Sequence, residues 1–181
     1  MLGADLKALV MLQTLQFALV LIFPVLVVIG GLRDLISFKI PNWISLALVA
    51  AFFPAALAVG AGPGAIGLHA AVGAAGLVVG MGMFAAGWIG GGDAKLFAAS
   101  VLWLGWPAAA PFALYMGLAG GCLAVTLLIL RSDWVNPFVM TGPAWFARLA
   151  RPGEGTPYGV AIAIGAMCAF PASTLPAALG S

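Results

Sequence analysis

The sequence predicts an all-α membrane protein, a polytopic bundle of about six transmembrane helices. Of its 181 residues, 64% are hydrophobic and only 7% are charged, whereas a soluble domain carries roughly 25% charged residues. The mean hydropathy is +1.19, and long uncharged runs are separated by short segments rich in glycine, proline or charge. This composition argues against a soluble domain, a disordered chain, a disulfide scaffold and a nucleic-acid-binding protein.

The uncharged runs divide into helices on the scale of about 20 apolar residues that one crossing requires. The first run, Ala8–Leu32, makes one crossing. The second, Ile40–Gly92, is too long for a single crossing. The glycine-proline turn Gly60–Gly64 divides it, so we expect helices at about Trp43–Val59 and Ala65–Trp88.

The later part of the chain needs another turn, because residues 94–130 as one helix would extend about 55 Å, nearly twice the hydrocarbon core of about 30 Å. Gly105-Trp106-Pro107 provides it. We therefore expect a short helix at Ala94–Trp106, shielded by its neighbours, and a full crossing at Ala109–Leu130. The sixth helix is expected at about Tyr158–Ala177.

The segment between the last two helices, Arg131–Thr156, is predicted to be a polar and aromatic loop. Within it, Thr141–Arg151 has the pattern of a short interfacial helix. No internal repeat and no composition shift divides the sequence. We therefore expect residues 1–181 to form a single transmembrane domain.

The basic residues support this helix count and give an orientation. With six crossings, one side of the membrane receives Lys7 alone, and the other receives Arg33, Lys39, Lys95, Arg131, Arg148 and Arg151. Basic side chains concentrate on the cytoplasmic side, so both termini are predicted to lie outside. If residues 94–130 made one crossing, the bias would disappear.

Two of the five acidic residues occupy unusual positions. Asp34 ends the first predicted helix, and Asp93 follows Gly90-Gly91-Gly92 at the start of the fourth. Both are therefore expected at the cytoplasmic boundary, where a carboxylate beside a membrane span marks a functional site. Taken singly, Asp34 could pair with Arg33 and Asp93 could cap its helix. Two such residues on one face favour cooperation.

Two neighbouring carboxyl groups share one proton, because like charges about 3 Å apart cannot both ionise. One group then acts as a base that activates water, and the other as an acid that protonates a peptide carbonyl. Asp34 sits at a helix C-terminus, which disfavours negative charge, whereas Asp93 begins a helix, whose N-terminus stabilises negative charge. We therefore expect Asp34 to be the resting acid and Asp93 the resting base.

Three motifs occur in order over nearly the whole chain. Asp34 is followed by Lys39-Ile40-Pro41-Asn42, then by Gly90-Gly91-Gly92-Asp93-Ala94-Lys95-Leu96, and then by Pro157-Tyr158-Gly159-Val160-Ala161. Together they resemble the type IV prepilin peptidase family. The second motif is similar to the Gly-x-Gly-Asp signature of intramembrane aspartyl proteases, a group that includes presenilin. The small size resembles the branch that processes Flp-type pilins of tight-adherence systems.

The resemblance implies a six-helix protease of the bacterial inner membrane. It would remove the short basic leader from type IV prepilin-like (Flp) pilins and pseudopilins at the cytoplasmic face. It also implies that Asp34 and Asp93 are the catalytic pair, and that Gly90 and Gly92 are the glycines of the second motif. The partners expected are the bilayer and a prepilin with a hydrophobic N-terminal helix.

Neither a cofactor nor a metal is expected. The sequence has only two cysteines, Cys122 and Cys168, and no Cys-x-x-Cys pair of the kind that holds zinc. Larger, bifunctional members of the family also methylate the mature pilin. We expect no such methyltransferase extension here, and therefore no methyl-donor cofactor.

The other motif residues are expected to support the aspartates. Pro41 and Asn42 are predicted to begin the second helix, with Asn42 as a possible N-cap that steadies the Asp34 loop. Lys95 either anchors a lipid phosphate or interacts with Asp93 and the substrate.

Pro157 places Tyr158 and Gly159 at the start of the last helix. Tyr158 is either a hydrogen-bonding group near the site or an interfacial aromatic residue. His69, near the outer end of its helix, is expected to have a structural role, and Glu154 is expected to be solvated.

A rival interpretation from another functional class is a small proton- or ion-coupled transporter in which Asp34, Asp93 and Lys95 form a relay. A structural assembly subunit is a weaker third option. Transporters place ionisable groups near the middle of the membrane on interrupted helices. Because these three residues are predicted at one boundary, the sequence favours the protease.

Overall fold

The computed structural model describes residues 2–151 and 153–180, and side chains within residues 5–151 and 153–179. The elements are α1 (Leu2–Ser37), α2 (Asn42–Ala58), α3 (Pro63–Ala85), α4 (Gly91–Leu130), α5 (Asn136–Val139), α6 (Ala144–Leu149), α7 (Tyr158–Ala169), η1 (Phe170–Ala172), α8 (Thr174–Ala177) and η2 (Ala178–Gly180). Four helical segments are long and apolar enough to cross a membrane: Asp5–Ser37 of α1, α3, α4, and Tyr158–Ala177, which runs from α7 to α8. α2 is a shorter apolar helix. The predicted all-α membrane fold is confirmed.

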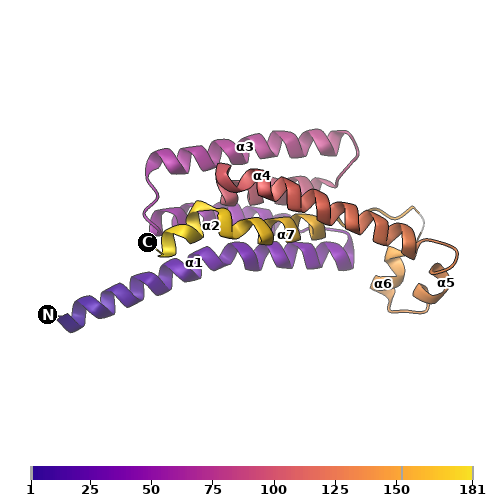
Figure 1. The fold of residues 1–181 in the computed structure, drawn as a ribbon, viewed down its shortest axis with the longest axis horizontal. Coiled ribbons are helices and arrows are strands. Elements are labelled where there is room, and N and C mark those ends of the chain that lie inside the picture. Colours follow the sequence, from indigo (N-terminus) through magenta and orange to yellow (C-terminus); the bar gives the residue numbers. More distant parts are fainter. Residues whose placement is uncertain (1, 152, 181) are drawn as a thin grey trace.

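The 40 residues of α4 form two arms that meet at Gly105. Gly105 has φ 69° and ψ −175°, a conformation essentially confined to glycine. Phe97 of the first arm (residues 91–104) stacks on Phe112 of the second arm (residues 106–130), with ring centroids 5.5 Å apart. The chain therefore reverses at Gly105 and the arms lie side by side (Figure 1). The turn predicted at this position is present, and the first arm is largely buried.

Replacing Gly105 by alanine is expected to destabilise the protein by about 1–3 kcal/mol through backbone strain alone. The added Cβ would also lie 2.6 Å from Cε1 of His69. Gly82→Ala is the matched control, because that glycine is exposed on α3 and its added Cβ would have no heavy atom within 4 Å. Thermal unfolding in detergent measures both variants. Equal unfolding temperatures would contradict a strained reversal at Gly105.

Trp103 of the first arm joins α4 to α1 and α2. Its side chain is fully buried, and its Nε1–H donates to the carbonyl oxygen of Leu48 at 2.8 Å. Its ring stacks on Phe23 of α1 with centroids 5.3 Å apart and meets Phe52 of α2 edge-on at 5.9 Å. This aromatic cluster fixes the first arm in the middle of the bundle.

His69 connects three elements at the end of the bundle opposite α5 and α6. Its Nδ1 lies 2.7 Å from the carbonyl oxygen of Leu102, and its Nε2 lies 2.9 Å from Oγ1 of Thr174. The ring is buried and stacks on Phe52. The expected structural role of His69 is therefore confirmed.

Several helices differ from the predictions in their bounds or continuity. α1 continues to Ser37, beyond the predicted end of its uncharged run, and Asp34 lies within its last turn, at the helix end as predicted. α3 ends at Ala85, before the predicted end at Trp88. The predicted helix Tyr158–Ala177 is broken by the 3-10 turn Phe170–Ala172, because Pro171 has no N–H to continue the helical hydrogen bonds.

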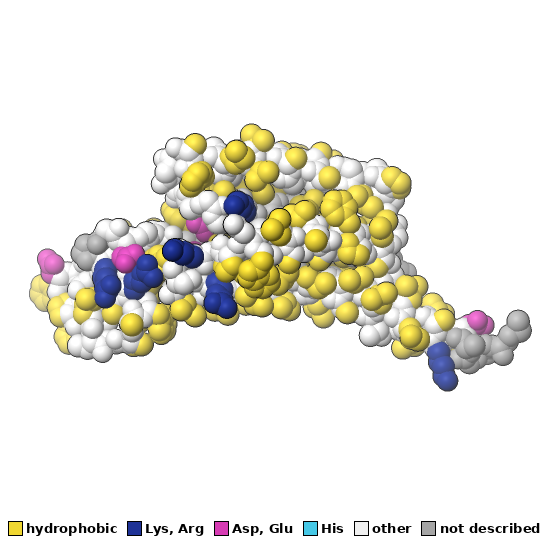
Figure 2. Space-filling view, turned by 180° about the vertical axis from the view of Figure 1, so that it is seen from behind, with side chains coloured by type: hydrophobic (Ala, Val, Ile, Leu, Met, Phe, Trp, Pro, Cys, Tyr) yellow, Lys and Arg dark blue, Asp and Glu magenta, His cyan; other side chains and the backbone are white. Residues whose placement is uncertain are grey.

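The surface of the molecule is divided by polarity. Figure 2 shows Lys and Arg side chains gathered over the end that carries α5 and α6, next to a broad hydrophobic surface. Large apolar side chains such as Leu21, Val78 and Leu128 are exposed along the helices. A soluble protein rarely exposes so much contiguous apolar surface, which suits contact with lipid.

Candidate active site

Three helix ends meet at the basic end of the bundle. Asp34 lies in the last turn of α1, Asp93 is the third residue of α4, and Gly159 is the second residue of α7. The N–H of Gly159 donates to Oδ2 of Asp34 at 2.7 Å and also interacts with the Asp93 carboxylate. The two carboxyl groups interact with each other electrostatically. The fold thus brings together the two aspartates that the sequence singled out.

Both aspartates are buried, with 4% of Asp34 and 6% of Asp93 exposed. Oδ2 of Asp93 accepts the N–H of Gly90 at 2.9 Å, which is the helix-capping contact that the sequence offered as the simpler explanation. Oδ1 of Asp93 is buried and has no hydrogen-bond partner among the described residues. Most buried polar atoms in proteins are paired, so this oxygen is available to a water molecule or a substrate.

The alternative explanation of Asp34, an ion pair with Arg33, is wrong. Within the described chain, the Asp34 carboxylate accepts a hydrogen bond from the N–H of Gly159, and no ion pair to Arg33 occurs. Arg33 is exposed, whereas Asp34 on the same helix faces the interior. Residues adjacent in a helix point about 100° apart, which separates the two side chains.

Asp34 lies at the C-terminus of α1 and Asp93 at the N-terminus of α4, as the assignment of acid and base assumed, but a further helix end acts on Asp34, and the assignment stays a prediction. Asp34 belongs to the last turn of α1, but its Oδ2 accepts an N–H from the first turn of α7. Asp93 accepts an N–H at the start of α4. Each carboxylate therefore faces the N-terminus of a helix, which stabilises negative charge. The N-terminus of α7 thus opposes the effect of the α1 C-terminus on Asp34.

The two carboxylates line a cavity of about 640 Å³, called here the carboxylate cavity. Its wall includes Phe38 after α1, the segment 87–90 before α4, and Tyr158 of α7. The remaining wall comes from the loop between α4 and α7, through Arg148 and residues 154–156. Of the predicted supporting residues, Gly90 and Tyr158 line this cavity, and Gly159 lies directly behind Asp34.

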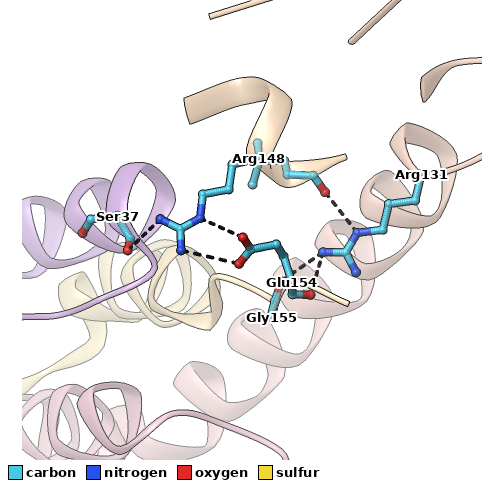
Figure 3. Close-up of polar contacts among 6 residues, drawn as sticks. Ser37, Arg131, Arg148, Glu154 and Gly155 are labelled. Atoms are coloured by element: carbon cyan, nitrogen blue, oxygen red, sulfur yellow. Dashed lines mark hydrogen bonds and ion pairs between the residues drawn. The ribbon is translucent and has the colours of Figure 1, made fainter. Parts of the chain in front are cut away.

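Arg131 and Arg148 hold the loop between α4 and α7 beside the cavity through hydrogen bonds and an ion pair (Figure 3). Nε of Arg148 lies 3.2 Å from Oε1 of Glu154, and its guanidinium lies 4.8 Å from the centre of the Phe38 ring. Arg131 donates to the carbonyl oxygens of Leu149, Glu154 and Gly155, each at 3.0 Å. This loop therefore forms a fixed wall of the cavity.

Sequence reasoning missed Arg148 and Glu154 as residues of the site. The Glu154 side chain keeps 28% of its surface exposed, but its carboxylate is also paired with Arg148 and lines the cavity. Three of the five acidic residues of the chain, Asp34, Asp93 and Glu154, line this one cavity. The scarcity of acidic residues, which singled out the two aspartates, was a signal for Glu154 as well.

A known family matches the part of the chain that contains both aspartates. The model of the type IV leader peptidase family matches residues 21–125, which is more than half of the 181 residues. The chain belongs to the type IV leader peptidase family. Membership makes this protein a peptidase of a membrane-embedded family. No curated protein and no solved structure matches it.

In this leader peptidase, Lys95 and Asn42 lie away from the carboxylate cavity. Nζ of Lys95 donates to Oδ1 of Asn42 at 2.9 Å, and both residues line a separate groove between α2 and α3. The N-cap of α2 is Pro41, and Asn42 is the first helical residue, so the predicted capping role of Asn42 is wrong. The predicted interaction of Lys95 with Asp93 is not formed, while contact with a lipid phosphate stays a prediction.

Gly92 of the family motif has a packing role in the peptidase. A Cβ on Gly92 would lie 3.1 Å from Cβ and 3.2 Å from the carbonyl oxygen of Ile40, the residue before Pro41. The bare backbone therefore lets α4 approach the segment that joins α1 to α2. This contact keeps the start of α4, and with it Asp93, close to the end of α1.

Proposed function

We propose that this leader peptidase is an aspartic endopeptidase of the bacterial inner membrane that removes the basic leader from Flp-type pilins and pseudopilins. The observation that carries the proposal is the meeting of two buried carboxyl groups, Asp34 and Asp93, in one cavity. Family membership favours peptide hydrolysis over the transporter alternative. The substrate is a prepilin whose hydrophobic N-terminal helix lies in the same bilayer as the enzyme.

The reaction uses one proton shared by Asp34 and Asp93. The ionised carboxyl accepts a proton from water while the water oxygen attacks the scissile carbonyl carbon, and the protonated carboxyl donates its proton to the carbonyl oxygen. The tetrahedral diol then collapses as a proton passes to the peptide nitrogen and the C–N bond breaks. The unpaired Oδ1 of Asp93 suits it to hold the water.

The backbone contacts of the pair fit this chemistry. Gly159 and Gly90 each give an N–H to a carboxylate oxygen, which fixes both side chains without a further charged residue. A carboxyl group held in one rotamer keeps the reacting atoms within the short distances that hydrolysis requires. No cofactor or metal takes part in this mechanism.

We further propose six membrane crossings, with both termini outside and the carboxylate cavity facing the cytoplasm. Three observations support this arrangement. α4 has two arms that reverse at Gly105. The beginning of α1 and α8 lie at the same end of the bundle (Figure 1), although residues 1 and 181 themselves are outside the described chain. Basic side chains gather at the other end, beside the cavity (Figure 2), as expected for the cytoplasmic side.

The proposal is tested with the purified full chain in lipid vesicles together with a Flp-type prepilin. We expect the mass of the pilin to fall by that of its leader, with the new N-terminus at the start of the hydrophobic helix. A pseudopilin precursor is expected to be processed as well. A Flp-type prepilin that inserts into the vesicles and stays intact would refute the proposed function.

A further inference from the structure

A second hollow, called here the glycine groove, adjoins the carboxylate cavity. It has a volume of about 290 Å³ and lies between Met83 of α3 and the second arm of α4, where Met116, Gly117 and Gly121 line it. Phe97 and Ile162 also line it. These lining residues are apolar, which suits a hydrocarbon or an apolar helix rather than a polar ligand.

The glycine groove and the carboxylate cavity are neighbours that share part of their walls. Trp88, Ile89 and Tyr158 line both of them. The groove between α2 and α3 and the groove between α1 and α7 have no lining residue in common with the carboxylate cavity. Among these apolar grooves, the glycine groove is therefore the one that adjoins the cavity of the two carboxyl groups.

The geometry points to the glycine groove as the binding site for the first turns of the hydrophobic helix of the substrate. This inference rests on the proposed function and adds where the substrate lies. The leader then enters the carboxylate cavity past Trp88 and Tyr158, and the mature helix continues along the second arm of α4 into the membrane. The peptide bond between the two segments falls at the junction, beside Asp34 and Asp93.

The two glycines on α4 make this groove suitable for a helix. Gly117 and Gly121 are four residues apart and therefore lie one above the other on the same helix face. Added Cβ atoms at these positions would have no heavy atom of the protein within 4 Å. Packing within the protein therefore leaves room for larger residues at both positions. Small residues at this spacing let a second helix approach closely within a membrane.

The first test fills the groove with Gly117→Leu and Gly121→Leu, each assayed on full-length prepilin in vesicles. Gly82→Leu is the matched control, because Gly82 is also an exposed helical glycine with free space around it and lines neither the groove nor the cavity. We expect kcat/KM to fall at least about 10-fold for the groove variants and to change less than about 2-fold for the control. Groove variants that cleave like wild type would overturn the inference.

The second test does not depend on catalysis. Gly117→Cys is placed in a Cys122→Ser, Cys168→Ser, Asp93→Asn background, and single cysteines are introduced along the mature helix of the prepilin. We expect disulfide cross-links at substrate positions in the first turns of that helix, recurring every three or four residues, and none with Gly82→Cys. Absence of these cross-links, as when a lipid chain or a second copy fills the groove, would overturn the inference. A wild-type enzyme that leaves the prepilin intact would instead refute the proposed function.

Discussion

Leader cleavage is expected to fall by about 10²–10⁴-fold when either Asp34 or Asp93 is replaced by asparagine, because each variant loses one partner of the acid–base pair. Asparagine keeps the size of the side chain, but it can neither take a proton from water nor give one to a carbonyl oxygen. In the proposed mechanism, the two residues act as one unit through a shared proton. The double variant is therefore expected to be no slower than the slower single variant.

The control for these variants is Asp133→Asn, a change at an exposed acidic residue of the loop after α4, and it is expected to cleave at the wild-type rate. Cleavage is measured by the mass of the pilin product over time in lipid vesicles. Thermal unfolding of each variant separates lost chemistry from lost structure. Removal of one of two neighbouring buried carboxyl groups is expected to leave the unfolding temperature unchanged or higher. A double variant slower than wild type by the product of the two single effects would contradict a shared-proton mechanism.

The reversal of α4 could be predicted because helix length is fixed by geometry. A straight helix of 40 residues would extend about 60 Å, twice the hydrocarbon core. The sequence offers glycine and proline at one place within it, and Gly105 adopts the conformation that makes the turn. The closeness of Asp34 and Asp93 could also be predicted from the sequence. A carboxyl group beside a membrane span is energetically costly, so two of them on one face of a chain with few acidic residues indicate a common site.

The loop between α4 and α7 could not be predicted in the same way. Its fold depends on Arg131, which donates hydrogen bonds to three carbonyl oxygens of residues 18–24 positions later in the chain. Backbone carbonyl groups occur at every residue, so no sequence pattern shows which ones an arginine will select. The place of Arg148 beside the cavity depends on this fold, and for that reason a charge count predicted only the side of the membrane on which Arg148 lies.

Lys95 and Asn42 illustrate another limit of sequence reasoning. Lys95 is two residues after Asp93 on the same helix, and residues two apart point about 200° away from each other. Nζ of Lys95 accordingly reaches Asn42 on α2, whereas Asp93 faces α1 and α7. Closeness in a motif therefore did not mean closeness in the site.

Gly159→Ala is expected to reduce cleavage by about 100-fold, because a displacement of catalytic groups by about 1 Å has an effect of that size. The added Cβ would lie 2.8 Å from Cβ of Asp34, 2.8 Å from Cδ1 of Ile40 and 2.9 Å from Oδ2 of Asp34. Since Cβ of Asp34 is attached directly to the backbone of α1, the contact is relieved only if α7 moves away. That movement lengthens the hydrogen bond from the N–H of Gly159 to Oδ2 of Asp34, which is 2.7 Å in the wild type.

Two further variants distinguish this explanation from a general effect of replacing a helical glycine. Gly67→Ala on α3, where an added Cβ has no neighbour within 4 Å, is expected to retain wild-type cleavage. Ile40→Ala combined with Gly159→Ala removes the contact with Cδ1 but leaves the one with Cβ of Asp34, so activity is expected to stay low even though the crowding is partly relieved. If the double variant regained full activity, packing against Ile40 would be the constraint at Gly159. Full activity of Gly159→Ala alone would show that Asp34 functions without the α7 N–H and its close packing.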